Sequence, residues 1–332
     1  MTVEQRKFAF AQLGIFISNI DKSQKQALAA QAYINNSWFT ENSINTALDG
    51  LAYYLEDSNL TKWLLPYNIL NVSPKNIGVI AAGNIPAVSF HDILCVLMAG
   101  HTLHAKLSSD DTVIIKYLLQ KLCEIEPAFA PYIHYPDKLT DIDAVIATGT
   151  NNTNRYFEYY YRDKPKILRK NRSSLAVITG NETQDELQLL GTDIFTYYGL
   201  GCRNVSKIIV PSGYDFNAFF EAMYPYNEVI NHSKYANNYE YRRAIYLMNG
   251  DKFLDNNFML LKESEQTASP VSVLYYHYYS HMNEVLDYIN THRENIQCVV
   301  QAGNNVHFGE TQKPNLWDYA DGVDTMQFLI SI

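Results

Sequence analysis

The first part of the chain carries a helical pattern. Apolar residues recur at near-helical spacing, as at Phe8, Leu13 and Ile17, and this predicts amphipathic helices. We expect the helical segment to run to about residue 66, because Pro66 and the polar stretch after it break the pattern.

From residue 77 onward, short apolar runs alternate with amphipathic stretches. The apolar runs predict strands at 77–82, 102–106, 142–148, 175–179, 206–210, 258–261, 271–276 and 297–300. The amphipathic stretches predict helices at 87–99, 112–124, 183–198 and 282–292, the first of them ended by Gly100. Three further helices are expected: one that follows residue 153 and ends at 161, one that begins at about 215 and one that begins at about 234. This alternation indicates βαβ units and mostly parallel sheets.

The pattern predicts an α/β fold of two lobes, mostly parallel in their sheets, with an N-terminal helical segment. We expect the first lobe to comprise residues 1–170, including the N-terminal helices, and the second to comprise residues 171–305. Residues 306–332 are expected to form a C-terminal segment that returns to the first lobe or contributes to an oligomer interface.

Two turns at strand ends are candidate ligand sites. Open parallel sheets bind ligands at the carboxyl ends of their strands, and Gly83–Asn84 and Gly149–Thr150 both follow predicted strands. The sequence has no G-x-G-x-x-G motif, so periodicity alone does not establish a nucleotide site.

Composition describes a globular protein with small-molecule or protein partners. The chain has 332 residues, 47% hydrophobic and 18% charged, which is enough apolar material for two cores. The net charge of −9 argues against general affinity for nucleic acid or anionic membranes. No leader-like start and no apolar run near the ~20 residues that a bilayer requires are visible, so we expect a cytoplasmic location and no transmembrane segment.

The four cysteines are far apart and form no C-x-x-C pair, so we expect neither a zinc site nor a disulfide framework. Cys95, Cys123 and Cys298 lie in apolar runs. Cys202 alone is bracketed by glycines, with Arg203 and Lys207 behind it. Neighbouring cations can lower a thiol pKa from ~8.5, so Cys202 is either a reactive thiol or an inert loop cysteine.

Two histidines stand four residues apart but do not predict a metal site. His277 and His281 lie in Y-Y-H-Y-Y-S-H, where a strand runs into a helix start, so they should not share one face. We expect no metal site.

Four landmarks, in order, carry a resemblance to a known family. Residues 77–86 (IGVIAAGNIP), 104–108 (HAKLS), 148–150 (TGT) and 199–202 (GLGC) resemble the asparagine turn, the lysine strand, the cofactor turn and the nucleophilic cysteine of aldehyde dehydrogenases. Residues 83–92, 199–207 and 318–325 resemble more specifically the acyl-CoA reductase branch typified by the LuxC fatty acid reductases. The resemblance covers roughly residues 70–330.

This resemblance implies roles for individual residues. It implies that Cys202 is the nucleophile and that Asn84 donates a hydrogen bond to the oxyanion. The implied cofactor-binding residues are Lys106, Ser109, Gly149, Thr150 and Glu265. Each has a structural alternative: Asn84 is a common turn residue, Lys106 can be an ordinary surface lysine, and Gly149–Thr150 can be strand-to-helix chemistry. Glu263, two residues earlier, is an alternative to Glu265 for the same role.

One departure from the family is informative. Hydrolytic members place a water-activating glutamate in a turn that aligns here with residues 168–173, where Arg169 takes its place and no acidic residue lies between Lys164 and Gly180. Without a general base, a thioester should resist water, as a reductase requires.

The implied activity is an NAD(P)H-dependent acyl-CoA reductase that forms a thioacyl-enzyme and releases coenzyme A and an aldehyde. Alternatives are a reductase that receives acyl groups from a protein partner, and a non-catalytic scaffold of the same fold. A homo-oligomer is also compatible with the resemblance.

The preferred cofactor is NADP(H), with NAD(H) as the alternative. NAD-preferring relatives carry a glutamate three residues after the strand lysine, and here that position is Ser109. A small neutral residue tolerates a 2′-phosphate. Asp110 and Asp111 follow, and we expect both to cap the next helix.

Overall fold

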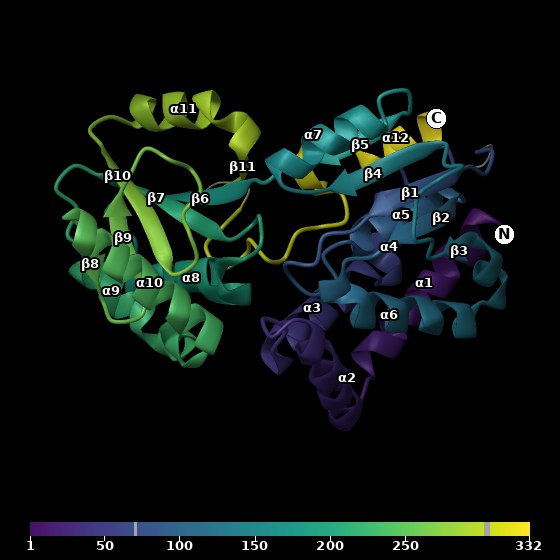
Figure 1. Cartoon of the computed structure of the whole chain (residues 1–332), viewed down its shortest axis with the longest axis horizontal. Helices are drawn as coiled ribbons and strands as arrows, with labels where there is room; N and C mark the ends of the chain where they lie inside the picture. Colours follow the sequence, from purple (N-terminus) through teal and green to yellow (C-terminus); the bar gives the residue numbers. More distant parts are fainter. Residues whose placement is uncertain (70–71, 302–305) are drawn as a thin grey trace. The chain divides into compact units, whose positions relative to one another are not determined.

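The computed structural model of the protein describes residues 1–69, 72–301 and 306–332. Its contacts divide the chain into two compact units, each with its own sheet (Figure 1). We call residues 1–171 with 315–332 unit 1, and residues 172–314 unit 2. Within the described residues, no helix is long and apolar enough to cross a lipid bilayer.

Unit 1 begins with helices, as the apolar pattern predicted. These are α1 (Val3–Ser18), α2 (Lys22–Asn35), α3 (Glu41–Tyr54) and α4 (Asp57–Leu64). Thr2 starts α1 through a capping box with Gln5. Leu13 and Ile17 are buried, but Phe8 is 62% exposed. The pattern therefore located the helix but not all of its buried face.

The sheet of unit 1 has five strands in the order β3-β2-β1-β4-β5, and every pairing is parallel. The strands are β1 (Asn76–Ile80), β2 (Thr102–Lys106), β3 (Ile133–His134), β4 (Ala144–Thr148) and β5 (Lys166–Arg169). The sequence pattern did not identify β3 and β5, because both are too short to produce a long apolar run.

Helix α5 (Phe90–Ala99) runs through the core of unit 1, and nearly all its residues are buried. It begins later than the predicted residue 87 because Ala87 has φ 56, a left-handed conformation that a right-handed helix excludes. It ends at Gly100, as predicted, with φ 92. Helices α6 (Thr112–Ile125) and α7 (Asn151–Tyr160) follow β2 and β4.

A buried ion pair joins α5 to the end of β5. Arg169 is 4% exposed and binds Asp92 through two hydrogen bonds, Nε to Oδ2 at 3.1 Å and Nη2 to Oδ1 at 2.6 Å. Burial acts to lower the pKa of the guanidinium, but the Asp92 carboxylate outweighs it and the pKa is raised. Arg169 is therefore a cation held in the core by its partner.

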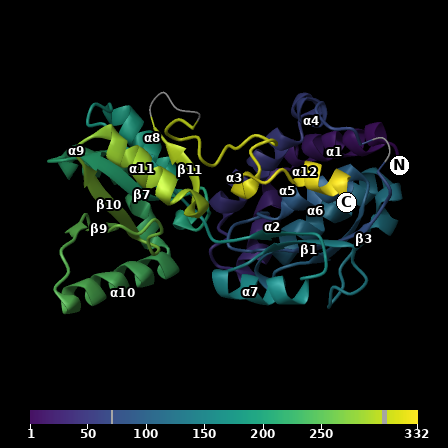
Figure 2. The ribbon, with the colours of Figure 1, turned by 90° about the horizontal axis from the view of Figure 1, so that it is seen from above.

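The same guanidinium holds the C-terminal segment of unit 1. Nη1 donates to Ala320 O at 2.7 Å, and Nη2 donates to Thr325 Oγ1 at 2.8 Å. Thr325 begins α12 (Thr325–Ser331), which lies beside α5 in both views (Figures 1 and 2). The Arg169 side chain therefore links β5, α5 and the C-terminal segment, which are distant in sequence.

Unit 2 contains a six-stranded sheet in the order β11-β6-β7-β10-β9-β8. The strands are β6 (Ser173–Val177), β7 (Val205–Pro211), β8 (Leu254–Asp255), β9 (Leu260–Glu263), β10 (Val273–Tyr279) and β11 (Ile296–Val300). Only the pairing of β8 with β9 is antiparallel. Its helices are α8 (Gln184–Phe195), α9 (Phe216–Met223), α10 (Ser233–Asn249) and α11 (Met282–Thr291).

We predict that Asp92→Ala destabilises unit 1 by about 3–5 kcal/mol, because it leaves the Arg169 guanidinium buried without its countercharge. All three tryptophans, Trp38, Trp63 and Trp317, belong to unit 1. Urea unfolding followed by tryptophan fluorescence therefore measures the stability of this unit in the whole chain.

The matched control is Asp163→Ala, which breaks the exposed Arg162–Asp163 pair and should change the unfolding free energy by no more than about 0.5 kcal/mol. Equal effects of Asp92→Ala and Asp163→Ala would contradict the stabilising role of the buried pair.

Candidate active site

Five of the predicted site residues of unit 1 lie at one edge of its sheet. Ile80 at the end of β1 pairs with Lys106 of β2, and β4 runs parallel on the other side, so the carboxyl ends of three adjacent strands are level. The residues at or just after these ends are Asn84, Lys106, Ser109, Gly149 and Thr150. Asn84, Lys106, Ser109 and Thr150 are exposed.

The turn that carries Asn84 packs tightly against the loop that follows β2. A Cβ on Gly83 would lie 2.6 Å from Ser108 Oγ, so a side chain at position 83 would force the two loops apart. Asn36 Nδ2 donates to Gly83 O at 3.2 Å, and Asn36 is itself buried. The β1 and β2 loops therefore fix each other, with Asn84 on the outer face.

The loop after β4 has a clear structural function. Thr150 caps α7, with Oγ1 accepting from Thr153 N at 3.2 Å. The amide of Gly149 donates to Arg169 O at 3.3 Å. The strand-to-helix interpretation therefore accounts for the local structure of both residues, and a role in cofactor binding stays a prediction.

The expectation that Asp110 and Asp111 cap the following helix is wrong. Asp111 occupies the N-cap position of α6 but makes no capping bond, while Ser108 Oγ accepts from Asp110 N at 3.3 Å. Asp111 is 2% exposed, and neither carboxylate oxygen has a hydrogen-bond partner among the described residues. Burial raises the pKa of Asp111 to about 8.

In unit 2, the loop that carries Cys202 is held by Asn204. Asn204 Nδ2 donates to Asp193 O at 2.9 Å and to Thr196 O at 2.8 Å, and Oδ1 accepts from Gly201 N at 2.8 Å. These bonds satisfy carbonyls at the end of α8, which stops at Phe195 rather than at the predicted residue 198. Buried Asn204 therefore determines both the end of α8 and the path of the cysteine loop.

The residues after α8 take an unusual backbone path. Tyr197 and Tyr198 have φ values of 53 and 57, a left-handed conformation that is uncommon for aromatic residues. Backbone strain of this kind concentrates at functional sites. Here it turns the chain from α8 into the loop that carries Cys202.

Cys202 is partly exposed, and its carbonyl accepts a hydrogen bond from Ser174 Oγ at 3.1 Å. Ser174 Oγ also lies 3.0 Å from Cys298 Sγ. The pairing of β6 with β11 and that of β6 with β7 both shift register near Ser174. Such bulges redirect side chains near functional sites, and here they place a second thiol beside the Cys202 loop.

The two cations that follow Cys202 are bonded to backbone carbonyls. Arg203 Nε donates to Thr311 O at 2.6 Å. Lys207 is fully buried, and its Nζ donates to Ser264 O and, at 3.2 Å, to Gln266 O. Burial lowers the pKa of Lys207 to about 8. A lysine inside an apolar strand pattern was the available signal for this residue, but its partners could not be predicted.

Lys207 and Tyr288 together hold the loop that contains Glu265. The Lys207 ammonium lies 4.7 Å from the centre of the Tyr288 ring, and Tyr288 OH donates to Glu265 O at 2.9 Å. The side chain of Glu265 is exposed. A fixed backbone with an outward carboxylate suits a binding residue, and Lys207 positions it, a role that its place behind Cys202 in the sequence did not predict.

The two histidines of the Y-Y-H-Y-Y-S-H stretch lie on different elements. His277 lies on β10 and His281 is the N-cap of α11, as the sequence analysis expected. The rings of His277 and Tyr288 are tilted by 48° with their centres 4.6 Å apart, and burial lowers the pKa of His277 to about 4. Within the part of the chain that the structure describes, no group of three histidine, cysteine or acidic side chains could bind a metal.

The sequence matches no protein-family model and no curated protein. The structure, in contrast, matches solved aldehyde dehydrogenases. The NAD⁺ complex of the Bacillus cereus enzyme aligns with a TM-score of 0.66 and 14% identity over 92% of this chain and 73% of that one. The chain has the fold of the aldehyde dehydrogenases.

Two further structures extend this likeness. An indole-3-acetaldehyde dehydrogenase of P. syringae, solved with NAD⁺ and IAA, aligns with a TM-score of 0.68 and 12% identity over 92% of this chain and 73% of that one. A 1-pyrroline-5-carboxylate dehydrogenase of Thermus thermophilus aligns with a TM-score of 0.63 and 13% identity over 99% and 80%. The predicted fold class is confirmed.

We predict that the Lys207 ammonium titrates near pH 8 in the folded protein. Its pKa lies below the ordinary 10.5, so between about pH 8 and 10.5 the unfolded chain binds the additional proton. Stability should therefore rise with pH across this window. The measurement is a ¹³Cε NMR titration of lysine-labelled protein, in which Lys207→Met should remove the resonance that titrates near pH 8.

The control is Lys262→Met, which removes a partly exposed lysine of neighbouring β9 that pairs with Asp251. It should leave the resonance in place. The assignment is wrong if no lysine titrates below pH 9, or if the resonance persists in Lys207→Met.

Proposed function

We propose that this protein is a nicotinamide-dependent oxidoreductase that reduces an acyl thioester to an aldehyde. The observation that carries the proposal is the loop at Cys202. A partly exposed thiol stands on a loop that Asn204 and Ser174 hold through hydrogen bonds, within a fold shared with enzymes solved with NAD⁺. A fixed, accessible thiol suits covalent catalysis.

The edge of the unit 1 sheet has features that fit a dinucleotide. It offers an exposed lysine, Lys106, at the carboxyl end of β2, and the neutral Ser109 three residues further along the chain. We assign Lys106 and Ser109 to the adenosine ribose, Gly149 and Thr150 to the pyrophosphate region, and Glu265 to the nicotinamide ribose. When bound, a reduced nicotinamide supplies a hydride.

The chain's own residues account for the covalent steps. The Cys202 thiolate attacks the carbonyl carbon of an acyl-CoA, the carbon–sulfur bond to coenzyme A breaks, and coenzyme A leaves as a thiolate that takes up a proton. We assign the Cys202 backbone N–H and the Asn84 amide as donors to the oxyanion. After hydride addition, the hemithioacetal breaks its carbon–sulfur bond, releases the aldehyde and restores the Cys202 thiolate.

The sequence around Arg169 contains no candidate general base, which favours reduction of the thioester over its hydrolysis. No acidic residue occurs between Lys164 and Gly180, and the Arg169 side chain is turned into the core, where it binds Asp92. It cannot activate water as a general base. The core position also means that Arg169→Glu would bury a second carboxylate beside Asp92, so this substitution would test folding rather than chemistry.

We further propose acyl-CoA as the acyl donor, with transfer from a protein partner as the alternative. Both donors would load the same thiol, so adduct formation by acyl-CoA alone distinguishes them. A non-catalytic scaffold would form no adduct with either donor.

We predict that Cys202→Ala abolishes both aldehyde formation and the acyl adduct detected by intact mass after incubation with an acyl-CoA. Folding should be retained, because the thiol is only partly buried and Asn204 and Ser174 hold the backbone of the loop. The rate of aldehyde formation should be at least about 10³-fold below that of the wild type, as expected when a covalent nucleophile is lost.

The matched control is Cys298→Ala, since this thiol lies beside the same loop and is not assigned to the reaction. It should form the adduct at nearly the wild-type rate. Adduct formation by Cys202→Ala, or its loss only in Cys298→Ala, would overturn the assignment of Cys202.

We predict that the wild-type protein prefers NADPH over NADH and that Ser109→Glu reverses this preference. A glutamate at this exposed position would repel a 2′-phosphate and accept hydrogen bonds from a ribose that lacks it. The ratio of kcat/KM for NADPH to that for NADH should fall by at least about tenfold, roughly 1.4 kcal/mol.

Asp110 is the matched comparison, because it is exposed next to Ser109 and already negative. If Asp110→Ser, rather than Ser109→Glu, controls the ratio, Asp110 faces the ribose and the preference for NADPH is wrong. An unchanged ratio in Ser109→Glu would remove Ser109 from the cofactor site.

A further inference from the structure

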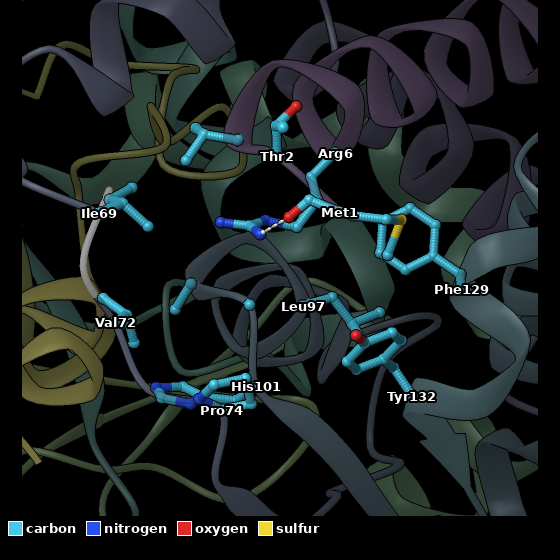
Figure 3. Close-up of a pocket in the computed structure, with 13 residues that line it drawn as sticks. Met1, Thr2, Arg6, Ile69, Val72, Pro74, Leu97, His101, Phe129 and Tyr132 are labelled. Atoms are coloured by element: carbon cyan, nitrogen blue, oxygen red, sulfur yellow. Dashed lines mark hydrogen bonds between the residues drawn. The ribbon is translucent and has the colours of Figure 1, made fainter.

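A cavity of about 310 Å³ lies within unit 1, apart from the residues assigned to catalysis. Figure 3 shows its lining, which comes from the start of α1, the residues Ile69, Val72 and Pro74, the end of α5 and the 3-10 helix Pro127–Tyr132. This volume is at the lower end of the range for small-molecule sites.

Polar and apolar groups contribute comparable areas to the wall. The apolar side chains that line it include Val3, Ile69, Val72, Pro74, Leu97 and Phe129. Tyr132 adds a phenol to this lining. The wall therefore suits a ligand with a hydrocarbon part.

Arg6 is a side-chain cation among the lining residues, and it is 7% exposed. Nε donates to Met98 O at 3.0 Å and Nη1 donates to Met1 O at 2.7 Å. No carboxylate of the described residues forms an ion pair with it. Burial lowers the pKa of the guanidinium, so the folded protein holds a cation whose desolvation no acidic side chain offsets.

The guanidinium is fixed in place by the end of α5. A Cβ on Gly100 would lie 3.0 Å from Nη1, 3.1 Å from Cζ and 3.3 Å from Nη2. The planar group thus lies flat against Gly100, directed toward the space beside Ile69 and Val72 (Figure 3). Its bond to Met98 O also makes it a cation at a helix C-terminus, a favourable position, but this leaves N–H groups of Nη2 unused.

His101 offers no second charge to the cavity. It is fully buried, its Nδ1 accepts from Lys75 N at 3.1 Å, and its Nε2 donates to Leu329 O at 2.9 Å. This pattern requires the neutral ring, and burial lowers its pKa. Recognition of an anion therefore depends on Arg6.

We propose that this cavity is a binding site for a small monocarboxylate with an apolar tail. The carboxylate would accept hydrogen bonds from the free N–H groups of Arg6, and the tail would contact Ile69, Val72, Leu97 and Phe129. A single charged side chain beside apolar residues favours a singly charged, weakly hydrated headgroup over a doubly charged phosphate. The site is independent of the proposed reaction, since none of its residues takes part in it.

The experiment titrates hexanoate into the whole protein by isothermal titration calorimetry, with hexanol and inorganic phosphate as parallel probes. We expect hexanoate to bind at one site and to raise the thermal midpoint followed by tryptophan fluorescence, which reports on unit 1. Hexanol and phosphate should bind at least about tenfold more weakly, because each supplies only one of the two recognised features.

Two variants test the site from different sides. Arg6→Gln removes the cation, and Val72→Phe fills the space while leaving Arg6 unchanged. Each should weaken hexanoate binding at least about tenfold. Arg162→Gln, which alters an exposed arginine elsewhere in unit 1, should leave the affinity unchanged and controls for general anion effects.

The proposal is overturned if hexanoate does not bind the wild-type protein at millimolar concentration. It is also overturned if Val72→Phe binds hexanoate normally, or if phosphate binds as tightly as hexanoate. Arg6 would then serve only to cap α5.

Discussion

Unit 1 depends on a charge that is buried away from water. Arg169 binds Asp92 of α5 through two hydrogen bonds and reaches Ala320 and Thr325 with the rest of its guanidinium. Burying an ion pair stabilises little in net terms, but losing one partner is costly. The pair therefore acts mainly as a specificity device: it admits one arrangement of α5, β5 and the C-terminal segment, and it penalises the alternatives.

Unit 2 uses neutral and acidic side chains for the same purpose. Asn204 binds the carbonyls that end α8, while Asp193 accepts hydrogen bonds from Gly309 N at 2.7 Å and Thr311 N at 3.0 Å. Burial raises the pKa of Asp193, and these donors oppose the shift. In both units, buried polar side chains bind backbone atoms of loops, and these hydrogen bonds fix loops that carry candidate site residues.

This division explains what the sequence could predict. Strand β2 and the helix end at Gly100 follow from local pattern and from glycine's access to positive φ, and both were found as predicted. The end of α8 was misplaced because Asn204, a residue outside the helix, determines it. The partners of Arg169 and Lys207 are far away in sequence, and no local pattern encodes such contacts. The candidate site residues could therefore be predicted from the sequence, but the residues that hold them in place could not.

The path of the chain has a consequence for biosynthesis. Unit 1 is assembled from residues 1–171 and 315–332, whereas unit 2 is one continuous stretch between them. A ribosome therefore completes all of unit 2 before it makes Ala320 and Thr325, the last partners of Arg169. Domains usually fold in the order in which they are synthesised. In this protein, unit 1 is the first to be synthesised in part and the last to be completed.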